Sequence, residues 1–126
     1  MTVELDAIVE RLAAEAAGGE GVEAYAELTT ETSVTAFQGE VERLTSASSS
    51  GVGVRVVSDG RLGYAYTADL SDDGLRECLA EARANLEVSG EDPGNVLPEA
   101  AAYQALEGLF DTRQTEADPE RKVSLA

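Results

Sequence analysis

Apolar side chains return at helical spacing in two stretches of the chain. Residues 3–17 place them three and four positions apart, with Thr2 available as the N-cap and a pair of glycines at 18–19 to stop the helix. Residues 72–88 repeat the spacing after Ser71, an N-cap residue followed by two aspartates that suit the first turn of a helix. The pattern predicts two amphipathic helices.

Between these helices, apolar and polar residues alternate, which is typical of strands with one buried face. We expect strands over residues 22–30, 33–37 and 40–46, with a tight turn at the Gln-Gly pair 38–39. The small polar run at 46–51 is interpreted as a strand end or a bend.

The stretch GVGVRVVSDGRLGYAYTADL, residues 51–70, raises a choice between a phosphate-binding loop and a β-hairpin. A dinucleotide-binding loop needs a glycine where Val56 stands, and a Walker loop needs a lysine that this stretch lacks. The pair Asp59 and Gly60 is instead a strong signal for a two-residue hairpin turn. The hairpin is therefore favoured.

Pairing outward from this turn assigns the two faces of the hairpin. On one face, Gly53 stands opposite Tyr66 and Arg55 opposite Tyr64. We expect Tyr66 to cover the bare backbone at Gly53 and Arg55 to lie against Tyr64. The other face sets valines opposite small residues, which leaves room for a helix.

The predicted fold class is α+β. It comprises an antiparallel meander sheet of about four to five strands over residues 22–68, with the helices 3–17 and 72–88 packed on one face. Residues 1–110 are expected to form this domain. Residues 111–126 are expected to be a linker and the start of a truncated helix.

The signals after the second helix are weaker. Residues 89–98 (SGEDPGNVLP) predict a loop, and residues 99–110 are compatible with a helix or a short extended segment. Asp118 and Pro119 stand as N-cap and first helical residue, but the helix that they begin is too short to be stable alone. The tail is therefore either disordered or the front of a longer polypeptide.

The net charge limits the classes of partner that the chain is expected to bind. Twenty-five acidic residues face nine basic ones, which gives a formal net charge of −16. Such a surface repels phosphate backbones and anionic lipid, so direct binding of nucleic acid or membrane is not expected. The acids are spread along the chain, which favours adaptation to a high-salt source over a single site for a basic partner.

The remaining composition points to a cytoplasmic protein. The single cysteine, Cys78, has no partner within the chain, and the N-terminus carries acids where a signal peptide has basic and apolar residues. No apolar run approaches the roughly 20 residues that span a bilayer.

Candidate catalytic chemistry is largely missing. The chain has no histidine, which excludes Ser-His-Asp and Cys-His catalysis and any zinc site with histidine ligands. Cys78 lies on the apolar stripe of its helix and is interpreted as a buried structural thiol. The oxygen-rich run 69–74 lacks the spacing of a calcium loop and is better explained by helix capping. We therefore assign no catalytic, cofactor-binding or metal-ligating residue.

Five short motifs follow one another along the chain, namely AYAE at 24–27, FQGEVE at 37–42, GVGVRV at 51–56, DGRLGYA at 59–65 and TADL at 67–70. This ordered set resembles the N-terminal domain of the TldD/PmbA family. The run EDPGNVLP at 91–98 is more similar to the PmbA side of the family than to the TldD side.

The resemblance implies a function that the residues alone do not. Members of the family are described as zinc-dependent peptidases and as modulators of DNA gyrase, and they act as dimers of TldD-type and PmbA-type subunits on peptide or protein substrates. In TldD-type members the zinc motif, H-E-x-x-x-H, lies beyond this region, and PmbA-type partners lack a working version. Nothing in this sequence matches the motif, so any zinc is expected in the missing downstream part.

The leading interpretation is thus a non-catalytic domain that serves subunit assembly or peptide presentation in a protein involved in proteolysis. An exposed sheet edge can take up an extended peptide through main-chain hydrogen bonds, and Tyr64, Tyr66 and Arg55 are the candidate peptide-binding residues. The tyrosines are equally compatible with ordinary packing. The alternative function is a stand-alone acidic protein-interaction domain with no enzymatic activity.

Overall fold

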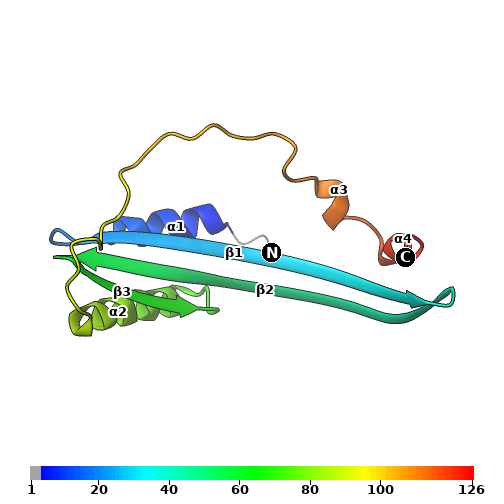
Figure 1. The fold of residues 1–126 in the computed structure, drawn as a ribbon, viewed down its shortest axis with the longest axis horizontal. Coiled ribbons are helices and arrows are strands. Elements are labelled where there is room, and N and C mark those ends of the chain that lie inside the picture. The colour runs from blue at the N-terminus through cyan, green and yellow to red at the C-terminus, as the bar shows by residue number, and fades with distance from the viewer. Residues whose placement is uncertain (1–3) are drawn as a thin grey trace. The chain divides into compact units, whose positions relative to one another are not determined.

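The computed structural model describes residues 4–126, and Figure 1 shows their secondary structure in chain order. The elements are helix α1 (Leu5–Ala14), strands β1 (Gly21–Phe37), β2 (Glu40–Ser58) and β3 (Arg61–Thr67), helix α2 (Asp72–Val88) and the short helices α3 (Thr112–Thr115) and α4 (Pro119–Val123). The strands form one antiparallel sheet in the order β1-β2-β3. This confirms the α+β class. Within residues 4–126, no helix combines the length and apolar character needed to cross a membrane.

The sheet has three strands in the described part of the chain, so the prediction of four to five is wrong. Strand β1 continues through residues 31–32, and β2 continues through the serine-rich run 46–51, where we expected breaks. Both segments are rich in Thr or Ser side chains that fit an extended backbone, and neither contains a proline or a residue with positive φ that would end a strand. Two long strands therefore replace four short ones.

Both predicted hairpin turns are present. Gln38 and Gly39 have φ of 52° and 81°, and Asp59 and Gly60 have φ of 49° and 72°. Positive φ at both central residues is the mark of a type I′ turn, whose twist matches the strands that it joins. The register of β2 with β3 is the one predicted from the second turn, with Ser58 opposite Arg61 and each outward pair following.

Helix α2 has the predicted bounds and the predicted cap. The Ser71 hydroxyl oxygen accepts a hydrogen bond from the backbone N–H of Gly74 at 3.1 Å. The Asp69 carboxylate in turn accepts one from the N–H of Ser71 at 2.9 Å, and this bond lowers the pKa of Asp69. The oxygen-rich run before the helix therefore serves to cap it.

Helix α1 is shorter than the predicted 3–17, and the proposed Thr2 cap lies outside the described residues. At its C-terminal end, the carbonyl of Glu15 accepts a hydrogen bond from Arg83 Nη2 of α2 at 2.8 Å. Arg83 also pairs with Glu20, with 3.0 Å between Nε and Oε1. These contacts hold the chain against α2 on both sides of the 18–19 turn, where both glycines have positive φ.

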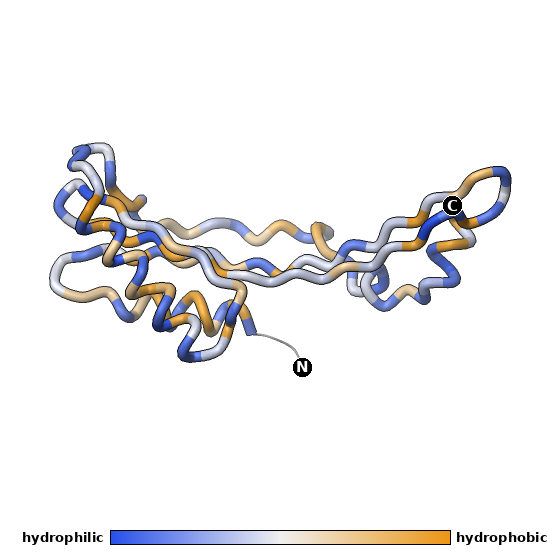
Figure 2. Tube along the Cα trace, turned by 90° about the horizontal axis from the view of Figure 1, so that it is seen from below, coloured by the Kyte–Doolittle hydropathy of each residue, from blue (hydrophilic) through white to orange (hydrophobic). Residues whose placement is uncertain are grey.

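The hydrophobic core lies on one face of the sheet, beneath both long helices. It contains side chains from α1, β2, β3 and α2, namely Leu12, Val52, Val54, Val56, Ala65, Leu75, Cys78, Leu79 and Ala82. Figure 2 shows the alternation of hydrophobic and hydrophilic positions along the strands that places these residues together. The Cys78 thiol is 3% exposed and burial raises its pKa, which confirms that it is a buried structural thiol.

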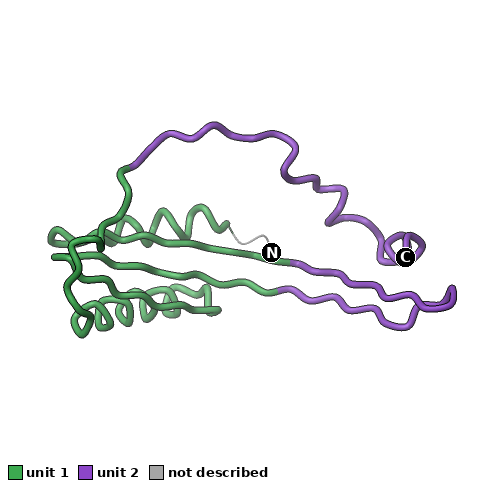
Figure 3. Tube along the Cα trace, viewed as in Figure 1, with its two compact units in different colours: residues 1–29, 49–99 green, residues 30–48, 100–126 purple. Residues whose placement is uncertain are grey.

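The chain divides into two compact units, which Figure 3 distinguishes by colour. The first comprises the residues up to Thr29 together with Ser49–Glu99, and it holds the core. The second comprises Thr30–Ser48 and Ala100–Ala126. The segment 99–110, which the sequence left open between helix and strand, has neither structure; it contains a turn with positive φ at Gly108.

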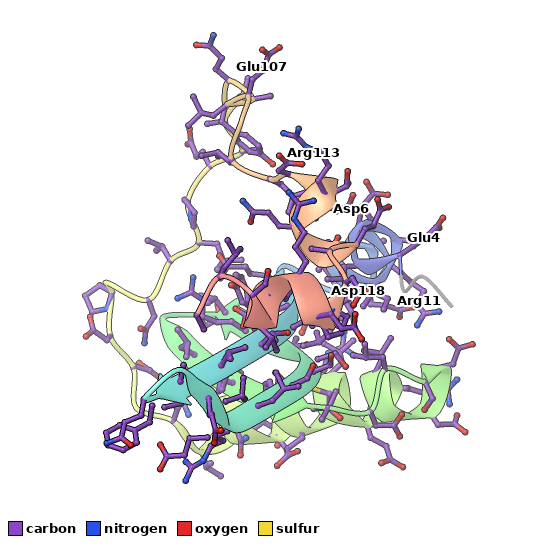
Figure 4. The ribbon with its side chains drawn as sticks, turned by 90° about the vertical axis from the view of Figure 1, so that its right-hand side faces the viewer. Glu4, Asp6, Arg11, Glu107, Arg113 and Asp118 are labelled. Atoms are coloured by element: carbon purple, nitrogen blue, oxygen red, sulfur yellow. The ribbon has the colours of Figure 1, made fainter. Side chains whose placement is uncertain are left out.

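The end of the second unit carries the capping that the sequence predicted. Asp118 accepts a hydrogen bond from the N–H of Glu120 at 2.9 Å, and Pro119 occupies the first position of α4. Figure 4 labels Asp118 at this helix and Arg113 on α3. Arg113 pairs with Asp111, with 2.6 Å between Nη2 and Oδ2, and this pairing lowers the pKa of Asp111.

Candidate binding site on the open face of the sheet

The sheet face opposite the core carries a hollow of about 420 Å³ within the first unit. All three strands contribute to it. Its lining residues are Glu23, Tyr25, Glu27, Ser49, Ser50, Gly51, Gly53, Arg55, Tyr64 and Tyr66.

The alternation of each strand explains why these side chains gather. On β2, Val52 and Val54 face the core, so Gly51, Gly53 and Arg55 face the other way. The glycines give the hollow a floor of bare backbone, and β3 supplies the tyrosines that stand over it. Tyr64 and Tyr66 are 54% and 59% exposed, so their rings are available to a ligand.

The tyrosines lie over different glycines from those that their register suggests. Tyr66 pairs with Gly53 across the strands, as predicted, but its ring covers Gly51. Tyr64 pairs with Arg55 and covers Gly53, where an added Cβ would lie 2.9 Å from the tyrosine hydroxyl oxygen. The expectation that Tyr66 covers Gly53 is therefore wrong. Side chains lean along the strand, so each ring reaches the diagonal neighbour.

Arg55 joins the floor of the hollow to β1. Its Nη2 lies 2.6 Å from Oε1 of Glu23, and both side chains are about two-fifths exposed. The Nε of Arg55 is buried and has no hydrogen-bond partner among the described residues. The guanidinium is thus paired with Glu23. The expected packing of Arg55 against Tyr64, its partner in the register, stays a prediction.

Tyr25 and Glu27 form the β1 side of the hollow. The Tyr25 hydroxyl donates to Oε2 of Glu27 at 2.8 Å, and the Thr29 hydroxyl donates to Oε1 at 2.8 Å. The two hydrogen bonds, that of Thr29 first, lower the pKa of Glu27. The same contact with Glu27 raises the pKa of Tyr25. At neutral pH the pair is therefore a neutral phenol beside a charged carboxylate.

The outer edge of β3 is partly occupied. The carbonyl oxygen of Tyr64 accepts a hydrogen bond from Asn85 Nδ2 of α2 at 2.9 Å. At the turn before β3, the carbonyl of Gly60 accepts from the N–H of Asp92 at 2.7 Å and from Asn95 Nδ2 at 2.9 Å. These main-chain positions are not free to bind a peptide as an added strand.

The structure brings the three sequence-predicted residues, Arg55, Tyr64 and Tyr66, into one hollow. Sequence reasoning missed the contribution of β1. The alternation of β1 did set Tyr25 and Glu27 on one side of that strand, but their meeting with Tyr64 depends on how β1 pairs with β2.

The residues present do not fit a zinc ion. Among residues 4–126 no group of three or more His, Cys, Asp or Glu side chains is placed to hold a metal. The chain has no histidine, and the thiol of Cys78 is buried in the core.

Comparison with known proteins identifies the domain type. The family model described as PmbA/TldA metallopeptidase domain 1 matches residues 22–86. No curated protein matches the chain at a significant level.

Two solved structures share the fold. A protein from Thermotoga maritima, described as a modulator of a DNA gyrase, is 26% identical with a TM-score of 0.75 over 97% of this chain and 27% of its own. TldE from Thermococcus kodakarensis is 18% identical with a TM-score of 0.64, over 83% of this chain and 24% of its own. The chain thus spans about a quarter of the length of these proteins. Since the family model covers more than half of this sequence, the chain belongs to the PmbA/TldA metallopeptidase domain 1 family.

Proposed function

We propose that this domain is the non-catalytic, peptide-holding part of a PmbA/TldD-type protein. The observation that carries the proposal is the hollow itself, in which Tyr25, Tyr64 and Tyr66 stand around a floor formed by Gly51 and Gly53. Exposed aromatic rings beside bare backbone offer a large contact area at a low cost in side-chain entropy. A structural role alone does not require three exposed tyrosines on the face away from the core.

In this proposal the peptide lies across the open face of the sheet. The edge of β3 is less suitable because the carbonyl of Tyr64 is already bound by Asn85. An extended peptide on the face would pack its side chains between the rings and place its main chain near the tyrosine hydroxyls. This differs from our expectation of strand addition at the edge, but it uses the same residues.

Peptide-bond cleavage and the zinc ion that supports it are assigned in this proposal to parts of the protein outside the matched region. A second subunit of the TldD/PmbA type is the proposed partner, forming either a homodimer or a heterodimer. Direct contact with DNA is not part of the proposal because the net charge of −16 opposes it.

The test is a titration of the full chain with short, capped peptides, followed by amide chemical shifts. Binding on the face should shift the amides of residues 23–27, 51–55 and 64–66 and leave those of α2 unchanged. Replacing Tyr64 and Tyr66 together by leucine should weaken binding about tenfold or more, because each ring contributes roughly 1 kcal/mol of contact. Tyr103→Leu is the matched control, since Tyr103 is 94% exposed and does not line the hollow.

Two results would contradict the proposal. One is the absence of any shift with peptides of several compositions. The other is binding that the double tyrosine variant retains in full while its unfolding free energy is unchanged.

A further inference from the structure

The hollow has a charge distribution that selects among peptide side chains. Two carboxylates, Glu23 and Glu27, and one guanidinium, Arg55, line it. Arg55 is paired with Glu23 at 2.6 Å, so these two charges offset each other. Glu27 accepts hydrogen bonds only from hydroxyl groups in the described part of the chain, those of Tyr25 and Thr29. The negative charge of Glu27 is therefore uncompensated by any neighbouring cation.

We propose that this hollow binds the basic side chain of a peptide, a lysine or an arginine, among Tyr25, Tyr64 and Tyr66 and beside Glu27. The inference rests on the proposed peptide-holding function and adds the class of side chain. The tyrosine faces attract a cation through their ring quadrupoles, and the carboxylate adds a direct charge partner.

Other side chains would gain less in the same place. An apolar side chain would contact the rings but leave Glu27 without a cationic partner and partly desolvated. An acidic side chain would meet Glu27 as a like charge, and the only cation in the hollow is already engaged with Glu23. An acidic side chain would therefore have to compete with Glu23 for the Arg55 guanidinium, whose Nε is buried in the floor.

Tyr25 and Glu27 are suited to hold a cation because they are fixed relative to each other. The hydroxyl of Tyr25 donates to the carboxylate at 2.8 Å, and Thr29 holds the second carboxylate oxygen at the same distance. The donated hydrogen bonds keep Glu27 ionised, since they lower its pKa. A basic side chain thus meets a carboxylate that is already oriented, which reduces the entropy lost on binding.

The experiment compares three capped alanine peptides that differ only in one central residue: lysine, norleucine or glutamate. Each is titrated into the full chain at a salt concentration high enough to screen the general attraction of a net charge of −16. Tyrosine fluorescence reports binding directly, because the chain has no tryptophan and three of its four tyrosines line the hollow.

We expect the lysine peptide to bind about tenfold more tightly than the norleucine peptide and the glutamate peptide to bind weakest. Glu27→Gln should remove most of the lysine preference, because lysine loses its charge partner and norleucine no longer desolvates a carboxylate. Glu77→Gln is the matched control, because it removes the same charge from a residue that lies on α2 and does not line the hollow.

The outcomes separate the two proposals. Equal affinity for lysine and norleucine peptides would overturn the cation preference and leave the peptide-holding function standing. A lysine preference that Glu27→Gln and Glu77→Gln reduce equally would show general charge attraction and would also overturn the preference. No binding of any peptide would overturn the proposed function itself.

Discussion

The ring of Tyr66 on β3 lies over Gly51 on β2, so a methyl group added at Gly51 would overlap its hydroxyl end. The obstacle is the far end of a flexible, exposed side chain and not the backbone. The contact therefore shapes the hollow more than it holds the sheet together.

Gly51→Ala should separate binding from stability. We expect Tyr66 to turn away and the unfolding free energy to change by no more than about 1 kcal/mol, partly because alanine restricts the unfolded chain. Peptide binding should weaken, since the ring no longer stands over the floor. Denaturant titration and the peptide titration measure the two effects. Gly90→Ala is the control because, apart from the two neighbouring residues in the chain, no described atom lies within 4 Å of the added group.

Gly63→Ala should give the opposite result. An added Cβ at Gly63 on β3 would overlap the carbonyl oxygen of Ala82 and the backbone nitrogen of Leu86, and it would lie 2.7 Å from Leu86 Cβ. Since the backbone of α2 cannot turn aside, the helix must move off the sheet. We expect the unfolding free energy to fall by about 3 kcal/mol or more, or the variant not to fold. A cooperative unfolding transition at the wild-type denaturant concentration would contradict this close packing.

The sequence predicted local features well where one or two residues determine them. Asp59 and Gly60 determined a turn, the turn determined the register, and Ser71 determined the start of a helix. The length of the strands was harder to predict from the sequence. Whether a run such as 46–51 bends or continues depends on the strand that pairs beside it, and small polar residues permit both outcomes.

The candidate site was predictable only in part, for a similar reason. Arg55, Tyr64 and Tyr66 share one hairpin whose register follows from its turn. Tyr25 and Glu27 join them through the pairing of β1 with β2, which the sequence pattern alone did not fix. The direction in which a tyrosine leans along its strand is a matter of side-chain packing and not of register.

The ion pair between Glu20 and Arg83 should make stability depend on pH. The hydrogen bond from Arg83 is the largest cause of the lowered pKa of Glu20. A carboxyl whose pKa is lower in the folded state stabilises the fold above its unfolded pKa, near the ordinary value of 4.5, and this contribution is lost as the pH falls through the folded pKa.

Glu20→Gln should therefore lower the unfolding free energy most at neutral pH. We expect a loss of about 1 kcal/mol there, because the Arg83 side chain is 37% exposed and solvent screens the pair. The difference from wild type should shrink as the pH falls below 4.5. Urea titrations across this range measure it, with Glu10→Gln on the exposed side of α1 as control. A difference that stays constant with pH would show that the pair contributes no charge-dependent stability.

Salt should stabilise the domain, because its carboxylates repel one another with few basic residues between them. The repulsion is also local: Glu77 and Glu81 stand one turn apart on α2, where like charges destabilise a helix. Molar KCl shortens the screening length to about 3 Å, so we expect the midpoint of thermal unfolding to rise by about 5 °C over dilute buffer. A variant with glutamine at both 77 and 81 should start higher in dilute buffer and gain less from salt. Equal midpoints of thermal unfolding in dilute buffer and in molar KCl would show that the acidity is not an adaptation to a high-salt source. A basic partner would then explain the charge better.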